Sequence, residues 1–450
     1  MIDERLADIV KAYDVRGLSP EQLSPEVARA LGEAFADEVG GDRIAIGHDM
    51  RETSPEIAEA FGDGVRASGV DVYEIGLAST DLLYFTSGDL DVPGAMITAS
   101  HNPAEYNGIK LCRAGARPIG FDTGLSSIAE EASGLLDRPE LPPATGGTEQ
   151  VDALARYVRY LHGLVPITPG RRLRVVVDAG NGMAGHTVPS VFADLDVELD
   201  PMYFELDGSF PNHDANPLDA STLVDLQARI RETGADIGLA FDGDADRCFV
   251  VDERGELVSP SAITALIAAR ALAEDPDATI LYNVICSKAV REVVAEHGGT
   301  GVRTPVGHSL IKAEMARTGA VFGGEHSGHF YFRDFFLADS GMLAALHVMA
   351  ALAETDGTVS ALMAEYERYP ASGEINSTVD DQAATVEKIA ARYADLAQDR
   401  LDGLTVEGDT WWFNVRASNT EPLLRLNVEG DDEATMARVR DEVLALIRSS

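Results

Sequence analysis

The sequence is poor in cysteine, and it has no long apolar run. Only three cysteines occur among the 450 residues, at positions 112, 248 and 286, and no two of them form a CxxC pair. This usage excludes a disulfide framework and gives no support to a zinc site. No apolar run reaches the roughly eighteen residues of a membrane-spanning helix, and the N-terminus lacks an apolar signal core. We therefore predict a cytoplasmic protein with no membrane partner.

Positive charge is also scarce. The chain has 36 basic against 75 acidic side chains, which gives a formal net charge of −39. Such a field repels nucleic acid, so we expect no nucleic-acid partner. An anionic small molecule needs a locally positive site. Four of the five lysines, Lys11, Lys110, Lys288 and Lys312, lie near the loops described below, although an arginine-biased composition is an alternative reason for that placement.

Length and hydrophobic patterning predict two to four α/β domains, because 450 residues exceed one ordinary core. Ser24-Pro25 and Ser54-Pro55 are typical of helix starts, and short β-rich runs alternate with amphipathic stretches. After Tyr369 the order of elements changes, which predicts a smaller α+β domain. Strands are expected at 43–47, 70–75, 94–98, 173–178, 237–241, 278–282, 411–415 and 423–428, and helices at 220–233, 259–273, 310–317, 383–401 and from 432.

The first chemically suggestive loop is Thr98-Ala99-Ser100-His101-Asn102-Pro103, at the end of an apolar strand. A serine hydroxyl there can attack or carry a phosphoryl group, with backbone N–H groups and His101 stabilising the charged oxygens. Serine and asparagine before proline are also ordinary turn residues. The hexapeptide alone therefore leaves both interpretations open.

The second loop, Asp242-Gly243-Asp244-Ala245-Asp246-Arg247, follows a predicted buried strand directly. Three carboxylates at alternate positions supply hard oxygen ligands and repel one another strongly without a cation. Mg²⁺ fits best, because the loop lacks the EF-hand pattern and Mg²⁺ combines few carboxylates with a phosphate oxygen. A solvated acidic turn is the alternative.

The third loop is Gly323-Gly324-Glu325-His326-Ser327-Gly328-His329. Its glycines let the backbone approach a ligand, and on an extended segment Glu325 and Ser327 point the same way, toward neighbouring sugar hydroxyls. The alternative is a glycine-rich hairpin with exposed histidines.

The fourth loop is Arg416-Ala417-Ser418-Asn419-Thr420-Glu421-Pro422, between two predicted strands. A guanidinium, two hydroxyls and an amide on a tight turn make a compact phosphate cradle. A polar hairpin turn explains the same residues.

Together, in this order, the four loops resemble the α-D-phosphohexomutase superfamily, most closely its phosphomannomutase/phosphoglucomutase branch. Further matches lie at 11–17, 47–51, 106–110 and 307–312, so the resemblance spans nearly the whole chain. It implies three related α/β domains with mixed sheets and a smaller C-terminal α+β domain around a central cleft. We expect domain I with the phosphoserine loop at 1–145, domain II with the metal loop at 146–252, domain III with the sugar loop at 253–365 and domain IV with the phosphate loop at 366–450.

The resemblance also implies roles for individual residues. Ser100 would carry the phosphoryl group and, with Asp242, Asp244 and Asp246, would bind Mg²⁺. Lys110 and Arg16 would act in proton transfer or charge stabilisation, supported by His101 and His329. The substrate-binding set would be Tyr13, Arg247, His308, Glu325, Ser327, Arg416, Ser418, Asn419 and Thr420.

The implied activity is that of an isomerase, an intramolecular phosphotransferase that acts on hexose phosphates through a hexose 1,6-bisphosphate. His326 favours mannose phosphate over glucosamine phosphate. Ile285 stands where the dual-specificity enzymes that this segment resembles have a lysine. Whether Lys288 supplies the missing positive charge is left open. Glucose or glucosamine phosphate, a metal phosphohydrolase and a non-catalytic phosphosugar sensor remain alternatives, and the expected assembly is a monomer or a dimer.

Overall fold

The computed structural model describes residues 1–138, 144–166, 170–417 and 423–449. The chain divides into two compact units. The first comprises Met1–Val258 and Ser327–Ser360, and the second comprises Ser259–His326 and Ala361–Ser450. None of the described helices is long and apolar enough to cross a membrane.

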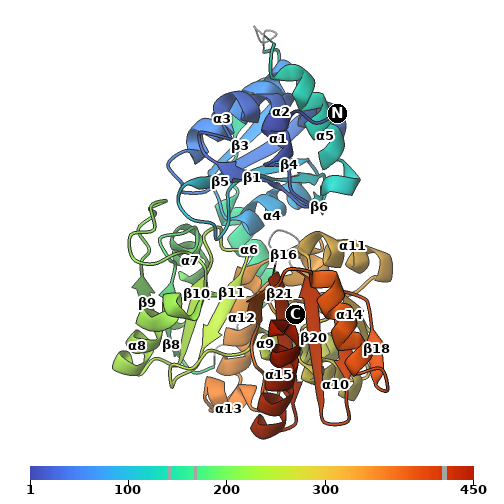
Figure 1. The fold of residues 1–450 in the computed structure, drawn as a ribbon. Helices are drawn as coiled ribbons and strands as arrows, with labels where there is room; N and C mark the ends of the chain where they lie inside the picture. The colour runs from blue at the N-terminus through green and yellow to red at the C-terminus, as the bar shows by residue number, and fades with distance from the viewer. Residues whose placement is uncertain (139–143, 167–169, 418–422, 450) are drawn as a thin grey trace. The chain divides into compact units, whose positions relative to one another are not determined.

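The N-terminal part of the first unit is a mixed seven-stranded sheet with strand order β1-β5-β4-β2-β3-β7 and β6 on β5 (Figure 1). Strands β2, β3, β4 and β7 run parallel, whereas β1, β4 and β6 pair antiparallel with β5. The strands are β1 Val15–Leu18, β2 Arg43–His48, β3 Asp71–Leu77, β4 Gly94–Ile97, β5 Tyr106–Arg113, β6 Arg117–Pro118 and β7 Thr148–Gln150.

Helices cover this sheet as its sequence pattern predicts. Ser24 caps α2 by accepting from the Val27 N–H, and Pro25 fits the first turn, where no N–H partner is needed. Ile44 and Ile46 of β2 pack in one apolar cluster with α2, α3 and α5. The helices are α1 Glu4–Ala7, α2 Pro25–Val39, α3 Ser54–Ala67, α4 Thr80–Leu90, η1 Phe121–Thr123 and α5 Leu125–Leu135.

The first unit continues with a four-stranded sheet of order β11-β10-β8-β9, in which only β10 and β11 are antiparallel. All five residues of β10 are buried, so the loop that follows starts deep in the protein. The strands are β8 Leu173–Asp178, β9 Val197–Met202, β10 Ile237–Phe241 and β11 Cys248–Val251, with helices α6 Leu154–Leu164, α7 Ala184–Phe192, η2 Ala220–Leu223 and α8 Val224–Thr233. A later segment adds β15 Phe330–Phe332, η3 Arg333–Phe335, β16 Ala338–Asp339 and α12 Gly341–Ala353.

The second unit begins with parallel strands, in which β12 lies between β13 and β14. The elements are α9 Pro260–Glu274, β12 Thr279–Asn283, α10 Lys288–Glu296, β13 Thr300–Thr304, α11 His308–Thr318 and β14 Phe322–Gly324. Helix α13, Val359–Met363, spans the division between the units.

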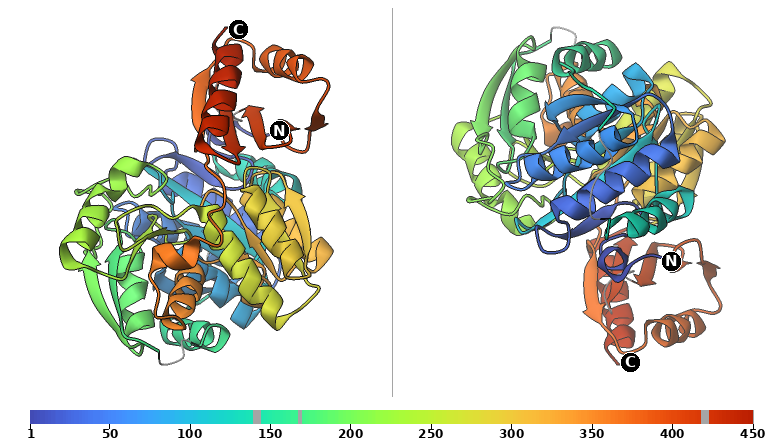
Figure 2. Two further views of the ribbon diagram at one scale, coloured as in Figure 1. Left: turned by 90° about the horizontal axis from the view of Figure 1, so that it is seen from below. Right: turned by 90° about the horizontal axis from the view of Figure 1, so that it is seen from above.

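The C-terminal part of the second unit is an antiparallel sheet of order β17-β21-β20-β19-β18, with its own apolar core. Figure 2 shows α15, the dark red helix that ends the chain, beside strands of this sheet. The elements are β17 Ile375–Thr378, α14 Gln382–Arg392, β18 Ala397–Asp399, β19 Leu404–Glu407, β20 Trp411–Ala417, β21 Leu423–Gly430 and α15 Glu433–Arg448.

One sequence prediction of secondary structure is wrong here. The helix expected over 383–401 ends at Arg392, and Ala397–Asp399 forms β18, paired antiparallel with β19. The side chain of Gln398 donates to the carbonyls of Ala390 and Tyr393, near the helix end. Pairing with β19 therefore overrides a local sequence that suits a longer helix.

Candidate active site

Ser100 lies on the loop after β4, and the fold holds it in an uncommon backbone conformation. Its φ is +51°, in the left-handed region that non-glycine residues rarely adopt. The Ser100 N–H donates to Oγ1 of Thr98 at 3.0 Å. Its hydroxyl donates to Oδ2 of Asp242 at 2.9 Å and accepts from Nη2 of Arg247 at 3.2 Å. The nucleophile predicted from the sequence therefore contacts both ends of the acidic loop.

Arg51, for which the sequence predicts no role, supports this loop through hydrogen bonds to its backbone carbonyls. Its side chain is 1% exposed, and its guanidinium pairs with Asp49 at 3.3 Å. The same guanidinium donates to the carbonyls of Ser100 at 3.0 Å, Asn102 at 2.7 Å, Pro103 at 2.8 Å and Tyr106 at 2.9 Å. Four carbonyls on one planar cation fix the path of the serine loop. The signal in the sequence was an arginine inside a matched motif, 47–51.

Three carboxylates converge on the loop after β10. Asp242, Asp244 and Asp246 are buried, and one ligand oxygen of each lies within 4.8 Å of the others. Lys110 of β5 donates to Oδ2 of Asp244 at 2.7 Å and to Oδ2 of Asp246 at 2.5 Å. Their Oδ1 atoms are buried and have no hydrogen-bond partner among the described residues. Two buried carboxylate oxygens without hydrogen-bond partners among the described residues, in a cluster with Asp242, fit a hard divalent cation.

The charges of this cluster shift the pKa values of its members. Burial raises the pKa of Asp242 to about 7, against the opposing effect of Arg247. Burial disfavours the ammonium of Lys110, but Asp244 and Asp246 outweigh it and hold the Lys110 pKa well above its ordinary value. In this arrangement the two carboxylates hold Lys110 in its charged form.

The serine loop and the acidic loop touch through their backbones. A Cβ atom added to Gly243 would lie 2.4 Å from the carbonyl oxygen of Ser100. Only glycine allows that approach, so Gly243 brings Asp242 and Ser100 within hydrogen-bonding distance.

Three further predicted residues lie around Ser100 in the first unit. Arg16 donates to Oδ1 of Asn102 at 2.7 Å, and Nε2 of His329 lies 3.6 Å from Oδ1 of Asp246. His101 has its Nδ1 against Arg247, and burial, together with Arg247 and Arg16, holds the His101 pKa well below its ordinary value. His101 is therefore neutral and accepts from Arg247. The structure thus gathers Ser100, His101, Arg16, Lys110, Arg247, His329 and the three aspartates.

Glu325 lies in the second unit, where its carboxylate accepts from Gly307 N at 3.1 Å and from Asn283 Nδ2 at 3.3 Å. The backbone at 326–327 forms a turn, so the expectation of an extended segment between Glu325 and Ser327 is wrong. Gly328, directly after this turn, has a φ of +86°, a backbone conformation that favours glycine. Ser327 contacts Nδ1 of His329 at 2.9 Å, within the first unit.

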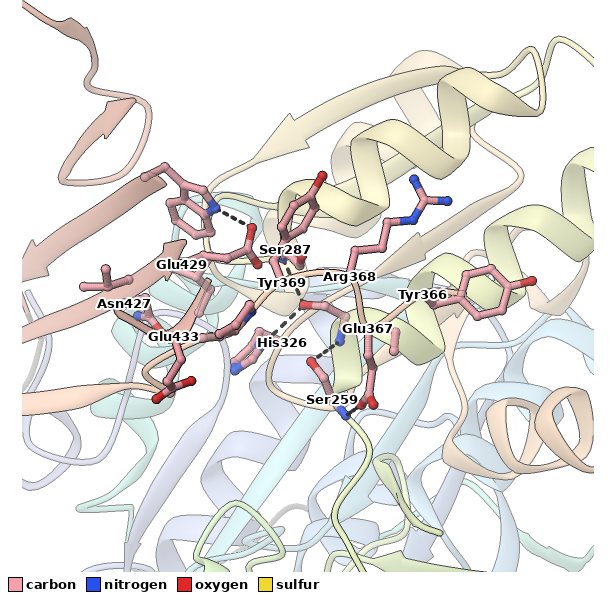
Figure 3. Close-up of a pocket in the computed structure, with 18 residues that line it drawn as sticks. Ser259, Ser287, His326, Tyr366, Glu367, Arg368, Tyr369, Asn427, Glu429 and Glu433 are labelled. Atoms are coloured by element: carbon pink, nitrogen blue, oxygen red, sulfur yellow. Dashed lines mark hydrogen bonds between the residues drawn. The ribbon is translucent and has the colours of Figure 1, made fainter. Parts of the chain in front are cut away.

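A cavity of about 470 Å³ opens beside this turn in the second unit (Figure 3). His326 lines it, 3.4 Å from Oγ of Ser261, and Glu429 accepts from Trp412 Nε1 at 2.8 Å. The guanidinium of Arg368 points away from the cavity in Figure 3 and pairs with Glu296 at 2.7 Å. His326 is thus among the residues that line this cavity, whereas Asn283 and Gly307, which bind Glu325, are not.

Lys288, which could compensate for Ile285, contacts other groups of the second unit. Its ammonium pairs with Asp431 and lies 3.8 Å from the centre of the Tyr369 ring. Ile285 is buried in the wall of the cavity. The positive charge at 288 is thus committed to contacts within the second unit.

The structure describes only some of the remaining predicted residues. Arg416, at the end of β20, pairs with Glu374 at 3.1 Å, and Tyr13 is partly buried in the first unit. Ser418, Asn419 and Thr420 lie outside the described residues, and so does the side chain of His308.

Comparisons with known proteins identify the family of this chain. Models of the four phosphoglucomutase/phosphomannomutase domains match residues 7–133 (alpha/beta/alpha domain I), 155–255 (II), 259–369 (III) and 374–446 (C-terminal domain). A phosphomannomutase of Salmonella typhimurium is 39% identical over 452 residues, covering 97% of this chain and 98% of the relative. The chain belongs to the phosphoglucomutase/phosphomannomutase family.

Other relatives agree with that membership. The phosphohexose mutases of Xanthomonas campestris pv. campestris are 38% identical over 443 residues, covering 97% of this chain and 98% of the relative. The crystal structure of a family protein from Burkholderia thailandensis matches with a TM-score of 0.90 and 33% identity, covering 100% of this chain and 98% of that one. The predicted superfamily, the α/β fold with mixed sheets and the enzyme class, an isomerase that transfers a phosphoryl group intramolecularly, are confirmed.

Proposed function

We propose that the protein is a magnesium-dependent phosphomannomutase, which interconverts mannose 1-phosphate and mannose 6-phosphate through phosphorylated Ser100 and a hexose 1,6-bisphosphate. The observation that carries the proposal is the position of the Ser100 hydroxyl. It lies 2.9 Å from Asp242 in a buried cluster of three carboxylates, and two oxygens of that cluster accept no hydrogen bond from the described residues. A hydroxyl and a cation site in contact are the elements that phosphoryl transfer requires.

The side chains around Ser100 have complementary tasks. Asp242, Asp244 and Asp246 would hold Mg²⁺ together with Ser100 or its phosphate, and the metal would neutralise charge on the phosphoryl oxygens. Arg247, 3.2 Å from the Ser100 hydroxyl, orients that oxygen, and Lys110 adds a second fixed positive charge. Arg16, His101 and His329 complete the polar surroundings, with the proton of the sugar hydroxyl leaving to one of them.

Both units would supply sugar recognition. Glu325 and His308 of the second unit would bind sugar hydroxyls, joined by Ser327 and Tyr13 of the first unit. Arg416 would hold the phosphate that is not reacting, with Ser418, Asn419 and Thr420. In this scheme the four domains, 1–145, 146–252, 253–365 and 366–450, enclose a central cleft, and the bisphosphate turns end for end within it. The enzyme would work in the cytoplasm, as a monomer or a dimer.

Mannose phosphate is the first choice of substrate because relatives of near-equal length are named phosphomannomutases, among them the Salmonella typhimurium enzyme. A dual specificity is the second candidate. The observation that favours it is a relative from Pseudomonas putida, 36% identical over 442 residues and named phosphomannomutase/phosphoglucomutase.

Phosphorylation of Ser100 is the decisive test. Intact-protein mass spectrometry should find one phosphoryl group on the wild-type protein after incubation with a hexose 1,6-bisphosphate and none on Ser100→Ala. Ser126→Ala, which changes a partly exposed serine outside the cluster, is the matched control. Absence of the phosphoryl group from the wild-type protein, or its persistence in Ser100→Ala, would overturn the proposal.

Turnover of the 1-phosphates of mannose, glucose and glucosamine then ranks the substrates. Mannose 1-phosphate should give the highest kcat/KM, and radiolabelled phosphate should stay in the sugar pool. Release of inorganic phosphate instead would identify a phosphohydrolase.

A further inference from the structure

Helix α4 begins against the acidic loop. Thr80, its first residue, donates from its backbone N–H to the carbonyl oxygen of Asp244 at 3.0 Å and from Oγ1 to Oδ2 of Asp244 at 2.5 Å. Oδ2 is also the oxygen that Lys110 contacts at 2.7 Å. Two protein donors thus engage Oδ2, whereas Oδ1 of Asp244 has no hydrogen-bond partner among the described residues.

Helix α12 begins against the other half of the same loop. A Cβ atom added to Gly341, its first residue, would lie 2.7 Å from the backbone carbon and oxygen of Arg247 and 3.0 Å from the carbonyl oxygen of Ala245. The backbone of α12 therefore rests directly on residues 245–247. The acidic loop is held between the starts of two helices.

Asp81 joins these two helix starts. Its side chain is 1% exposed, and its carboxylate accepts from Oγ of Ser79 at 2.5 Å, from the Tyr157 hydroxyl at 2.6 Å and from Oγ of Ser340 at 2.6 Å. Ser79 and Ser340 are the N-caps of α4 and α12, and each accepts from a backbone N–H of its own helix. One buried carboxylate thus connects both caps and helix α6.

We propose that Asp81 is a positioning residue for the metal site: it fixes the starts of α4 and α12 relative to each other and so sets the spacing of Asp242, Asp244 and Asp246. Asp81 touches neither the cluster nor a substrate group, and it acts through Thr80 and Gly341. The inference rests on the proposed function in that it takes the three aspartates as the metal ligands. Removing a group that does not bind the metal but orients its ligands typically lowers metal affinity by about 10- to 100-fold.

The test measures metal affinity directly, with Mn²⁺ as the probe and electron paramagnetic resonance of the free ion as the readout. Asp81→Asn keeps the side-chain shape but places an amide group among three hydroxyl donors. We expect its Mn²⁺ Kd to rise about tenfold, and the spectrum of bound Mn²⁺ to broaden because the ligand spacing becomes less uniform. Ser87→Ala is the matched control, because it removes a buried hydroxyl at the far end of α4 that donates to the Val92 carbonyl at 2.6 Å. Its thermal stability should fall while its Mn²⁺ Kd stays that of the wild type.

Tyr157→Phe removes one of the three hydroxyls that donate to Asp81, and it replaces Asp81→Asn in the test if that variant does not fold. Its Kd should rise less than that of Asp81→Asn but more than that of Ser87→Ala. Unchanged Mn²⁺ affinity in the folded Asp81 variant, or in Tyr157→Phe, overturns the positioning role, provided that Asp244→Asn loses Mn²⁺. If Asp244→Asn binds Mn²⁺ like the wild type, the metal assignment in the proposed function is what fails.

Discussion

At the scale of single residues, the active site depends on burying more charge than the interior readily accepts. Three buried aspartates form one cluster, in which Lys110 and Arg247 make ion pairs with them. Burying unpaired charge is costly, and the raised pKa of Asp242 reflects that cost. We therefore expect the arrangement to be more stable with a bound cation than without one.

A substitution at Lys110 tests how far the buried cations offset the charge of the three aspartates. Removing one partner of a buried ion pair typically costs about 3 to 5 kcal/mol, so Lys110→Met should lower the free energy of unfolding by roughly that amount in EDTA. Saturating Mg²⁺ should recover part of the loss, since the metal then offsets Asp244 and Asp246. Urea unfolding with and without Mg²⁺ measures both values, with exposed Lys388→Met as control. An equal loss in both conditions would contradict the explanation.

Asp81 gives a prediction about pH. Burial raises its pKa from 3.8 to about 6, against the hydrogen bonds of Ser340, Ser79 and Tyr157. The folded state therefore holds this proton more tightly than the unfolded state, and the resulting stability, complete below pH 3.8, is lost as the pH rises through about 6. Relative to Asp81→Asn, the wild type should lose on the order of 1 kcal/mol between pH 5 and pH 7. Urea unfolding at pH 5, 6 and 7 compares the two proteins, and parallel pH curves would refute the shift.

At the scale of elements, the site is made by loops that follow buried strands. The serine loop follows β4 and the acidic loop follows β10, so short apolar strands deliver polar residues to the interior. Gly243 and Gly341 then allow backbones to touch where a side chain would hold them apart. Helix starts at Thr80 and Gly341 complete the support.

Gly243→Ala tests the contact between the two loops. Its new methyl group would meet the Ser100 carbonyl oxygen at 2.4 Å, so Asp242 and Ser100 must move apart. We expect kcat to fall at least about tenfold, as a small misplacement of reacting groups is costly, and stability to fall by about 1 to 3 kcal/mol. Gly134→Ala, in helix α5 with nothing within 4 Å of the added Cβ, is the control and should be stabilising by roughly 0.5 to 1 kcal/mol. Steady-state kinetics and thermal unfolding check both, and wild-type kcat in Gly243→Ala would rule out the contact.

At the scale of the whole molecule, the net charge of −39 dominates. Charges of one sign repel one another, and repulsion is stronger in a compact state than in an extended chain. Salt screens this repulsion, with a Debye length of about 10 Å at 0.1 M.

Thermal stability should therefore rise with salt. In EDTA, Tm should increase by several degrees, roughly 1 to 2 kcal/mol of stability, between 0.05 and 0.5 M KCl. Sucrose at matched osmolality controls for solute exclusion and should not reproduce the salt curve. A Tm that is flat or falling with KCl would show that attractive ion pairs outweigh the repulsion.

The sequence by itself determined the alternation of strands and helices, the four loops and the family. These depend on local order along the chain: an apolar strand followed by Ser100 or Asp242 can be read directly. It failed where local preference conflicted with tertiary pairing, as at β18, and where a turn at 326–327 replaced an extended segment.

Only the tertiary structure decided the partners of the charged groups. The sequence marks Arg51 only as part of a matched motif and does not give its contacts with the serine loop. Nothing in the sequence pattern indicates that Lys288 pairs with Asp431 or that Asp81 joins the caps of two helices. Ser340 lies 259 residues from Asp81 in the chain, and Asp431 lies 143 residues from Lys288. Hydrogen bonds and ion pairs act over a few ångströms of space, so these partnerships exist only once the fold has brought distant segments together.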